Sequence, residues 1–280
     1  MLFRSCGIMF IKSFRLHNLL YGLAALLLVA AITGNLVVMG VRALGASRET
    51  AAPAPPGEGA AETLEGGFPS GEAEGKVVYL SFDDGPSVMT AEILDVLKEK
   101  NVPATFFVIG ATTERGKMLY QRIVDEGHAL GIHSYSHRYG EIYASADAYL
   151  KDFNRLSDHL ESIVGVRPSI FRFPGGSNNK HASKEVLKEI KTRMEKAGNV
   201  WFDWNAIAKD DKSKATPAQK MFDNIVKSAG EKEKILILMH DDALRTTAPE
   251  CIRMLVDYYT GLGYRFEKLT PETDPIRFGG

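Results

Sequence analysis

Short apolar runs alternate along the chain with segments whose apolar residues recur at helical spacing. The runs 77–82, 104–109 and 235–240 are continuous and β-prone, as in strands that are buried on both faces of a sheet. Two shorter runs, 170–173 and 200–203, have the same character. The helical spacing predicts helices at residues 91–100, 148–164, 185–196, 218–228 and 249–260, and a further helix that closes at residues 122–126, before Gly127.

This alternation predicts an α/β fold built from repeated strand and helix units. About seven strands are expected, fewer than the eight of a closed barrel, so the predicted architecture is a distorted or incomplete (β/α) barrel. Folds of this kind place their chemistry on the loops that follow the C-terminal ends of the parallel strands. Polar residues at strand ends are therefore the first candidates for an active site.

The segment 19–41 contains no charged residue. A helix of this length, at 1.5 Å per residue, crosses a hydrocarbon layer of about 30 Å. Three basic residues and no acidic one precede it. This predicts a cytoplasmic tail at 1–18 and a transmembrane signal anchor at 19–41, in a cell-membrane protein whose catalytic part is extracytoplasmic. The alternative is a secreted protein cut after a signal peptide near Ala43 and Gly45, although signal peptides usually have apolar regions of only about 7–15 residues.

Residues 42–75 are expected to be a flexible linker, because Ala, Pro, Gly, Glu and Ser dominate them and large apolar side chains are few. The catalytic domain is predicted at 76–270, with a C-terminal tail at 271–280. The formal net charge of -1 over 280 residues gives no indication of nucleic-acid binding. Cys6 and Cys251 are expected on opposite sides of the membrane, so no disulfide is predicted.

Two motifs combine acidic and imidazole groups in a way that suits a hydrolytic metal site. Residues 81–86 read Ser-Phe-Asp-Asp-Gly-Pro, and residues 133–137 read His-Ser-Tyr-Ser-His. Two imidazoles and one carboxylate give three protein ligands and leave coordination positions for water and substrate. The second aspartate can then act as a base. An ordinary turn is the alternative interpretation of the first motif alone, and the histidine pair favours the metal site.

Further polar residues follow other expected strands. Arg172 ends one strand, Asp203 and Trp204 end the next, and His240 ends another. Each has a structural interpretation when taken singly, as a surface cation, a strand end with a core aromatic, or a capping group. Together they are expected to converge with the two aspartates of the first motif on one rim of the barrel. The charged run 209–214 is expected to be an exposed loop.

With these residues in place, the chain resembles the polysaccharide deacetylase family, the NodB-homology group of carbohydrate esterases, across nearly all of residues 77–269. Five motifs of that family occur here in order, at residues 81–86, 133–137, 172–175, 203–204 and 238–240.

The resemblance implies a role for the matching residues. Asp84, His133 and His137 are the implied metal ligands. Asp83 is the implied base that deprotonates a metal-bound water, and His240 is the implied acid that protonates the leaving amine.

It also implies residues that support these groups and bind the substrate. Arg172 is similar to the arginine that orients the base, and Asp203 to the carboxylate that positions the acidic histidine. Gly175 is implied to offer its backbone N–H to the oxyanion, and Trp204 and Leu238 to wall the pocket for the acetyl methyl group. The family often has Tyr where Gly175 stands, so the glycine pair at 175–176 is expected to widen the sugar-binding groove beside the metal.

The predicted function is metal-dependent hydrolysis of N-acetyl groups on an extracellular glycan, with N-acetylglucosamine of peptidoglycan as the preferred substrate. The alternatives are N-acetylmuramic acid, chitin-like or other surface polysaccharides, O-acetyl xylan, or a non-catalytic glycan-binding module of the same fold. Zn²⁺ is the first choice of metal, and the ligand set also suits Co²⁺, Mn²⁺ or Ni²⁺. The expected partners are the glycan and, through the anchor, the lipid bilayer.

Overall fold

A computed structural model describes residues 75–212 and 214–279 of the chain. The predicted cytoplasmic tail, membrane anchor and all but the last residue of the linker lie outside these residues. The strands are β1 (Val77–Asp83), β2 (Thr105–Ile109), β3 (Ala129–Ser134), β4 (Ile170–Phe171), β5 (Val200–Trp201), β6 (Ala206–Ile207), β7 (Lys234–His240) and β8 (Arg265–Glu267). The helices are α2 (Thr90–Lys100), α3 (Glu114–Asp125), α4 (Tyr139–Ile142), α5 (Ala146–Val164), α6 (Lys184–Lys196), α7 (Ala218–Ala229) and α8 (Ala248–Gly261).

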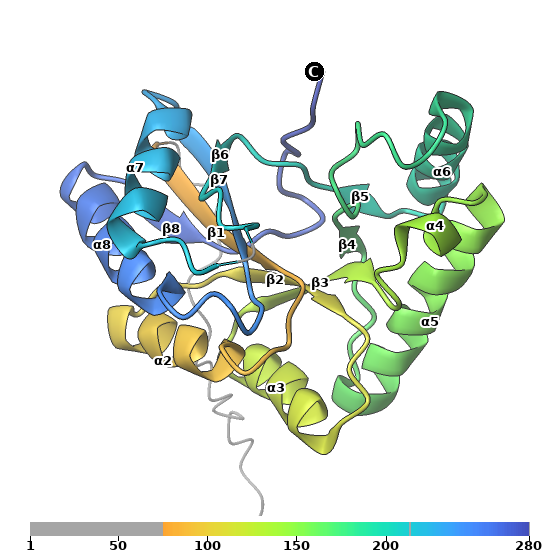
Figure 1. The fold of residues 1–280 in the computed structure, drawn as a ribbon, viewed down its shortest axis with the longest axis horizontal. Coiled ribbons are helices and arrows are strands. Elements are labelled where there is room, and N and C mark those ends of the chain that lie inside the picture. Colours follow the sequence, from red (N-terminus) through yellow and green to blue (C-terminus); the bar gives the residue numbers. More distant parts are fainter. Residues whose placement is uncertain (1–74, 213, 280) are drawn as a thin grey trace, which may run out of the picture. The chain divides into compact units, whose positions relative to one another are not determined.

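The strands form one parallel sheet in the order β5-β4-β3-β2-β1-β7-β6. An eighth strand, β8, pairs with the first half of β1, and β2 pairs with the second half. The larger helices lie along the outside of the curved sheet, from α7 and α8 through α2 and α3 to α5 and α6 (Figure 1). Within the described residues β5 and β6 are the two ends of the sheet and do not pair. The predicted distorted, incomplete barrel is confirmed.

Several helices begin at a residue that caps them. The side chains of Thr113, Ser145 and Ser183 each accept a hydrogen bond from a backbone N–H in the first turn of α3, α5 and α6. Such caps satisfy donors that have no partner inside the helix, and each contributes about 1 kcal/mol. Two helices end at a residue in the left-handed region, Asn101 after α2 and Gly165 after α5.

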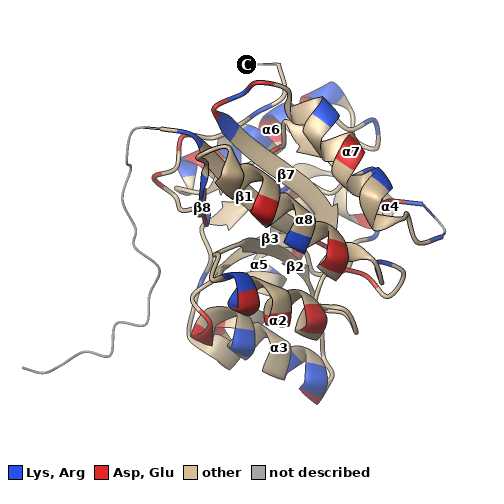
Figure 2. Ribbon diagram, turned by 90° about the vertical axis from the view of Figure 1, so that its left-hand side faces the viewer, with Lys and Arg blue, Asp and Glu red and all other residues tan. Residues whose placement is uncertain are grey.

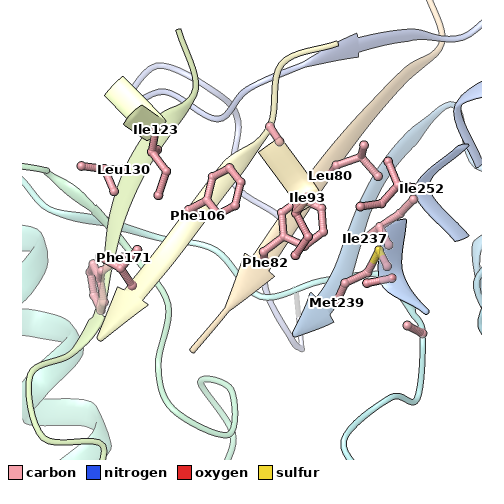
Figure 3. Packing of buried hydrophobic residues seen from close by; sticks show 14 of the residues in the cluster. Leu80, Phe82, Ile93, Phe106, Ile123, Leu130, Phe171, Ile237, Met239 and Ile252 are labelled. Atoms are coloured by element: carbon pink, nitrogen blue, oxygen red, sulfur yellow. The ribbon is translucent and has the colours of Figure 1, made fainter. Parts of the chain in front are cut away.

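The two faces of the sheet have different surroundings. Because side chains alternate along each strand, the position of a residue in the strand decides on which face its side chain lies. Leu80 and Phe82 of β1 belong to the large core beneath the helices, with Ile93 of α2 and Ile252 of α8 among their neighbours (Figure 3). Val77 and Tyr79 belong to a smaller cluster on the opposite, inner face. Because successive side chains of a strand point to opposite faces, Ser81 and Asp83 also point to the inner face.

The sequence predicted the longer elements better than the short ones. All six expected helices are present, and α3 ends within residues 122–126, where the sequence predicts that a helix closes. The strands β3, β6 and β8 had not been expected, and β6 has only two residues. The C-terminal segment 276–278 is also ordered against the domain, because the carbonyl oxygen of Ile276 accepts a hydrogen bond from the N–H of Asp203 at 2.8 Å. The predicted C-terminal tail thus contacts the domain.

Charges of both signs are interleaved on the outer sides of α2, α3 and α8 (Figure 2). Arg253 of α8 pairs with Glu99 of α2 at 2.8 Å, and Lys100 pairs with Asp257 at 2.7 Å. Exposed pairs of this kind contribute little to stability individually. None of the helices in the described part of the chain is long and apolar enough to cross a membrane.

Candidate active site

The candidate residues meet at the C-terminal ends of the parallel strands. Asp83 ends β1 and His240 ends β7, and these two residues are direct partners in the register of the two adjacent strands. His133 lies near the end of β3. Arg172 follows β4 directly and donates its backbone N–H to the carbonyl oxygen of Ile132, at 2.9 Å. The strand ends thus bring together residues that are up to 157 positions apart in the sequence.

Asp84, His133 and His137 form a cluster whose nitrogen and oxygen atoms all lie within 4.8 Å of one another. Oδ1 of Asp84 lies 3.2 Å from Nε2 of His137 and 3.5 Å from Nε2 of His133. That oxygen is buried, and none of the residues that the structure describes forms a hydrogen bond with it. A buried, unpaired carboxylate oxygen is costly, and a cation held between it and the two imidazoles removes the cost.

His133 is arranged as a metal ligand. Its Nδ1–H donates a hydrogen bond to the carbonyl oxygen of Arg172 at 2.9 Å, which leaves the lone pair of Nε2 facing Asp84. Burial lowers the pKa of His133 to about 3, although the charge of Asp84 acts in the opposite direction. The ring is therefore neutral at physiological pH, as metal ligation requires. The three residues fit a divalent ion of the kind bound by imidazole and carboxylate.

The side chain of Asp152 of α5 holds the loop between the two histidines in place. Its carboxylate accepts hydrogen bonds from the hydroxyl of Ser134 and the N–H of Tyr135, both at 2.6 Å, and from the N–H of Ser136 at 3.0 Å. The Ser134 oxygen in turn accepts the N–H of His137 at 2.9 Å. Asp152 touches neither imidazole, yet it determines the path of the backbone that presents both. Sequence reasoning gave no indication of this role, because Asp152 lies in the middle of a long amphipathic helix.

Asp83 is buried and paired with a fully buried cation. Its Oδ1 accepts a hydrogen bond from Nη1 of Arg172 at 2.8 Å. The same nitrogen donates to Oγ of Ser81 at 2.8 Å, and the guanidinium lies 4.3 Å from the ring centre of Phe107. Burial raises the pKa of Asp83, while the charges of Arg172 and His240 act to lower it. Arg172 therefore fixes the carboxylate and favours its ionised form.

The partner of His240 is Asp210, not Asp203. Nδ1–H of His240 donates to Oδ1 of Asp210 at 2.8 Å, and the backbone N–H of His240 donates to Oδ2 at 2.9 Å. The carboxylate of Asp203 is engaged elsewhere: it accepts the N–H and hydroxyl of Ser177 and the N–H of Phe278. The prediction that Asp203 positions the acidic histidine is therefore wrong. Its carboxylate is directed instead toward the glycine turn and the C-terminal segment, where Ser177 and Phe278 lie.

Asp210 lies within the charged run 209–214, which had been expected to be an exposed loop. It is instead fully buried. The residue follows β6 by three positions, and β6 is the neighbour of β7 in the sheet. The strand-end rule that singled out the other residues would have found Asp210, but a strand of two residues has too little pattern to be recognised.

The comparisons with known proteins agree with this geometry. Residues 70–194 match the family model described as polysaccharide deacetylase. Over 213 residues the chain is 30% identical to a peptidoglycan-N-acetylglucosamine deacetylase of Bacillus cereus, and the match covers 73% of this chain and 74% of the relative. The chain belongs to the polysaccharide deacetylase family.

Solved structures that resemble this deacetylase include two further carbohydrate-active enzymes. The catalytic domain of a peptidoglycan N-acetylglucosamine deacetylase from Eubacterium rectale matches with a TM-score of 0.67 and 30% identity, over 72% of this chain and 92% of that chain. A family 4 acetyl xylan esterase from Clostridium thermocellum, in complex with a cobalt ion, matches with a TM-score of 0.59 and 28% identity, over 69% and 88% of the two chains. The chain is thus a hydrolase of the deacetylase class.

The three predicted substrate-binding residues of the deacetylase lie on the same rim. Gly175 has a φ of 77°, and its N–H donates to no acceptor within the described residues. The ring of half-buried Trp204 lies 5.8 Å from the guanidinium carbon of Arg172. Leu238 of β7 is level with Ser81 in the sheet and, two residues before His240, points to the same face.

Proposed function

We propose that this deacetylase hydrolyses N-acetyl groups of a glycan, using a divalent ion held by Asp84, His133 and His137. The observation that carries the proposal is the juxtaposition of this cluster with two groups suited to proton transfer. One is the buried Asp83 carboxylate held by Arg172, and the other is a histidine held by Asp210.

A divalent ion bound by the cluster would polarise the acetyl carbonyl and make water a competent nucleophile at neutral pH. The chain supplies the proton transfers. Asp83 accepts a proton from the attacking water, for which it must be ionised, and Arg172 favours that form. Its other oxygen, Oδ2, lies 3.9 Å from Nε2 of His133, so the base borders the metal cluster directly.

His240 then serves as the acid. Burial lowers its pKa, but the hydrogen bond and charge of Asp210, together with Asp83 and Asp84, raise the pKa to about 9. The imidazole is therefore protonated at neutral pH and can donate its proton to the nitrogen of the amide as the carbon–nitrogen bond breaks. A new carbon–oxygen bond from water gives acetate, and the sugar keeps a free amine. A base that is ionised and an acid that is protonated at the same pH are what this reaction requires.

Three residues complete the site in this proposal. The unpaired N–H of Gly175 stabilises the developing oxyanion. Leu238 and Trp204 wall the space for the acetyl methyl group. The N–H of Gly175 is effective as a donor because it is already oriented before the reaction begins.

We propose N-acetylglucosamine units of peptidoglycan as the substrate. The names of the Bacillus cereus relative and of the Eubacterium rectale structure support this choice. We further propose that residues 19–41 anchor the chain in the membrane and that the linker carries the domain into the cell wall. The charge-free length of that segment supports the anchor.

We propose Zn²⁺ as the metal, because two imidazoles and one carboxylate with open positions are typical of catalytic zinc sites. The cobalt ion in the Clostridium thermocellum esterase supports a divalent transition metal more generally. Acetate release from defined glycans, measured with the metal-stripped chain and after addition of Zn²⁺, Co²⁺, Mn²⁺ or Ni²⁺, tests the proposal. We expect no release without metal and release from N-acetylglucosamine oligomers with it. Absence of release with every metal would refute the enzyme activity proposed here.

A further inference from the structure

Other side chains lie close to the turn formed by Gly175 and Gly176. Both glycines are in the left-handed region, with φ of 77° and 85°. A Cβ atom on Gly176 would lie 2.8 Å from the ring of Phe278 and 3.1 Å from the ring of Trp204. A Cβ atom on Gly175 would lie 3.4 Å from Cε1 of Tyr139 and 3.7 Å from its hydroxyl oxygen. The rings of Phe278 and Trp204 thus lie beside Gly176, and Asn179 and Tyr139 lie beside Gly175.

Phe278 comes from the C-terminal segment, and its backbone and its ring both contact the domain. Its N–H donates to Oδ2 of Asp203 at 2.9 Å. Its ring meets the ring of Trp204 edge to face, with centroids 4.8 Å apart. The neighbouring Arg277 lies 3.5 Å above the ring of Trp201. Contacts of Arg277 and Phe278 thus hold the segment against the domain, while the phenyl ring itself remains only half-buried.

Tyr139 approaches the same turn from the side of the metal cluster. Its ring lies perpendicular to that of His137, with centroids 5.2 Å apart. The ring of Tyr139 also contacts the ring of exposed His181, with centroids 4.1 Å apart, and a row of aromatic rings continues from it through Tyr143 and Tyr149. The two inner tyrosines are buried, and Tyr143 donates its hydroxyl to the carbonyl oxygen of Pro174 at 2.8 Å.

Tyr139 differs from these neighbours in its exposure, because its side chain is only half-buried. Within the described residues its hydroxyl has no hydrogen-bond partner, as is also true of the buried hydroxyl of Tyr149. A phenol in this state presents an apolar face and a free polar group at the edge of the metal cluster, which is the combination found in ligand-binding surfaces. The two inner tyrosines are buried in the core, whereas Tyr139 is accessible to a ligand beside the metal cluster.

We propose that Tyr139 and Phe278 bind the sugar that carries the reacting acetyl group, one on each side of the glycine turn. The hydroxyl of Tyr139 donates a hydrogen bond to a polar group of the sugar, and the ring of Phe278, supported by Trp204, packs against its apolar face. The two residues thereby make the sugar contacts that a side chain at position 175 would otherwise make. This inference rests on the proposed function for the identity of the ligand as an N-acetylated glycan.

The test uses the full-length chain and the tetrasaccharide of N-acetylglucosamine as the probe. Tyr139→Phe removes only the hydroxyl, and Phe278→Ala removes the ring but keeps the N–H that bonds to Asp203. Tyr258→Phe and Leu262→Ala are the matched controls, because these exposed residues lie on and after α8, away from the site. Two quantities are measured, kcat/KM for acetate release and the dissociation constant of the tetrasaccharide for the metal-stripped chain.

We expect each of the two site variants to lower kcat/KM and to weaken tetrasaccharide binding by about fivefold to tenfold. Metal affinity and melting temperature should match those of the unaltered chain, and the controls should change nothing. Unaltered tetrasaccharide binding and kcat/KM in both variants would overturn the inference, and so would a loss explained entirely by weaker metal binding. If the unaltered chain releases no acetate from any glycan, the proposed function fails, while weakened binding in the variants would still support the sugar contact.

Discussion

Asp210 holds His240 at two points, with one carboxylate oxygen on the imidazole Nδ1–H at 2.8 Å and the other on the backbone N–H at 2.9 Å. The first bond fixes the tautomer and leaves Nε2 of the ring as the proton donor. The second fixes the end of β7 against the loop after β6. A single buried carboxylate thus determines both the charge and the orientation of the proposed acid.

Removing that charge should change the pH dependence of the reaction. His240 acts as an acid only when protonated, so activity is lost as the pH rises through its pKa of about 9. The Asp210→Asn side chain keeps an oxygen acceptor for His240 but loses the negative charge. The pKa of His240 should therefore fall toward its ordinary value of 6.5. We expect the alkaline limb of the kcat/KM profile to move to lower pH. Asp211→Asn, a change at the exposed neighbour, is the control. If the alkaline limb of the kcat/KM profile moved in Asp203→Asn and stayed in place in Asp210→Asn, the assignment of Asp210 as the partner of His240 would be wrong.

Substitutions of the two adjacent aspartates, Asp83 and Asp84, should impair the enzyme in different ways. Asp84→Asn should release the metal, because it neutralises the carboxylate of the ligand cluster. Asp83→Asn should retain the metal and lose about two to four orders of magnitude in rate, the usual contribution of a general base. Metal content per chain and acetate release separate the two effects. Equal loss of metal in both variants would refute the division of roles.

Asp152 should influence metal affinity without touching the metal. Its three hydrogen bonds hold residues 134–136, so Asp152→Ala frees the loop that carries His137. Groups that orient ligands typically contribute about tenfold to a hundredfold to affinity. We expect a weakening of that size in calorimetric titrations with Zn²⁺. Asp158→Ala, on the exposed side of the same helix, should leave the affinity unchanged. An Asp152→Ala chain with full affinity would show that the loop is held by other contacts.

The sequence predicted the parts of the site that follow long strands. β1 and β7 have seven residues each and a clear apolar pattern, so Asp83 and His240 could be recognised as strand-end residues. The motif spacing identified His133 and His137 in the same way. The incomplete barrel also followed from the alternation of strands and helices.

The parts that the sequence did not predict depend on tertiary contacts. Asp210 follows a two-residue strand within a run of charges, which is the usual pattern of a solvated loop. Phe278 lies in a segment with no periodicity, and only its packing on Trp204 and Gly176 reveals that it belongs to the domain. Asp152 resembles any polar residue of an amphipathic helix until its hydrogen bonds are known.

The proposed anchor makes a prediction about cells. With residues 19–41 retained in the membrane, the full-length protein should sediment with the membrane fraction. Protease added outside intact cells should cut the proposed linker and release an active domain, because segments of this composition are typical sites of proteolysis. Immunoblotting of the two fractions with activity assays measures this. Soluble protein that begins near Ala46 and comes from untreated cells would indicate signal cleavage instead.

The central claim is that this chain removes acetyl groups from amino sugars by means of the Asp84, His133 and His137 cluster. The most direct measurement is mass spectrometry of peptidoglycan that has been incubated with the Zn²⁺-loaded full-length chain and then digested with a muramidase. We predict that fragments lose acetyl groups from glucosamine, with release of an equal amount of acetate, and that the His133→Ala chain leaves the same material unchanged. A folded, metal-loaded chain that leaves both amino sugars fully acetylated and releases no acetate would contradict the account, and loss of acetyl groups from muramic acid alone would contradict the choice of sugar.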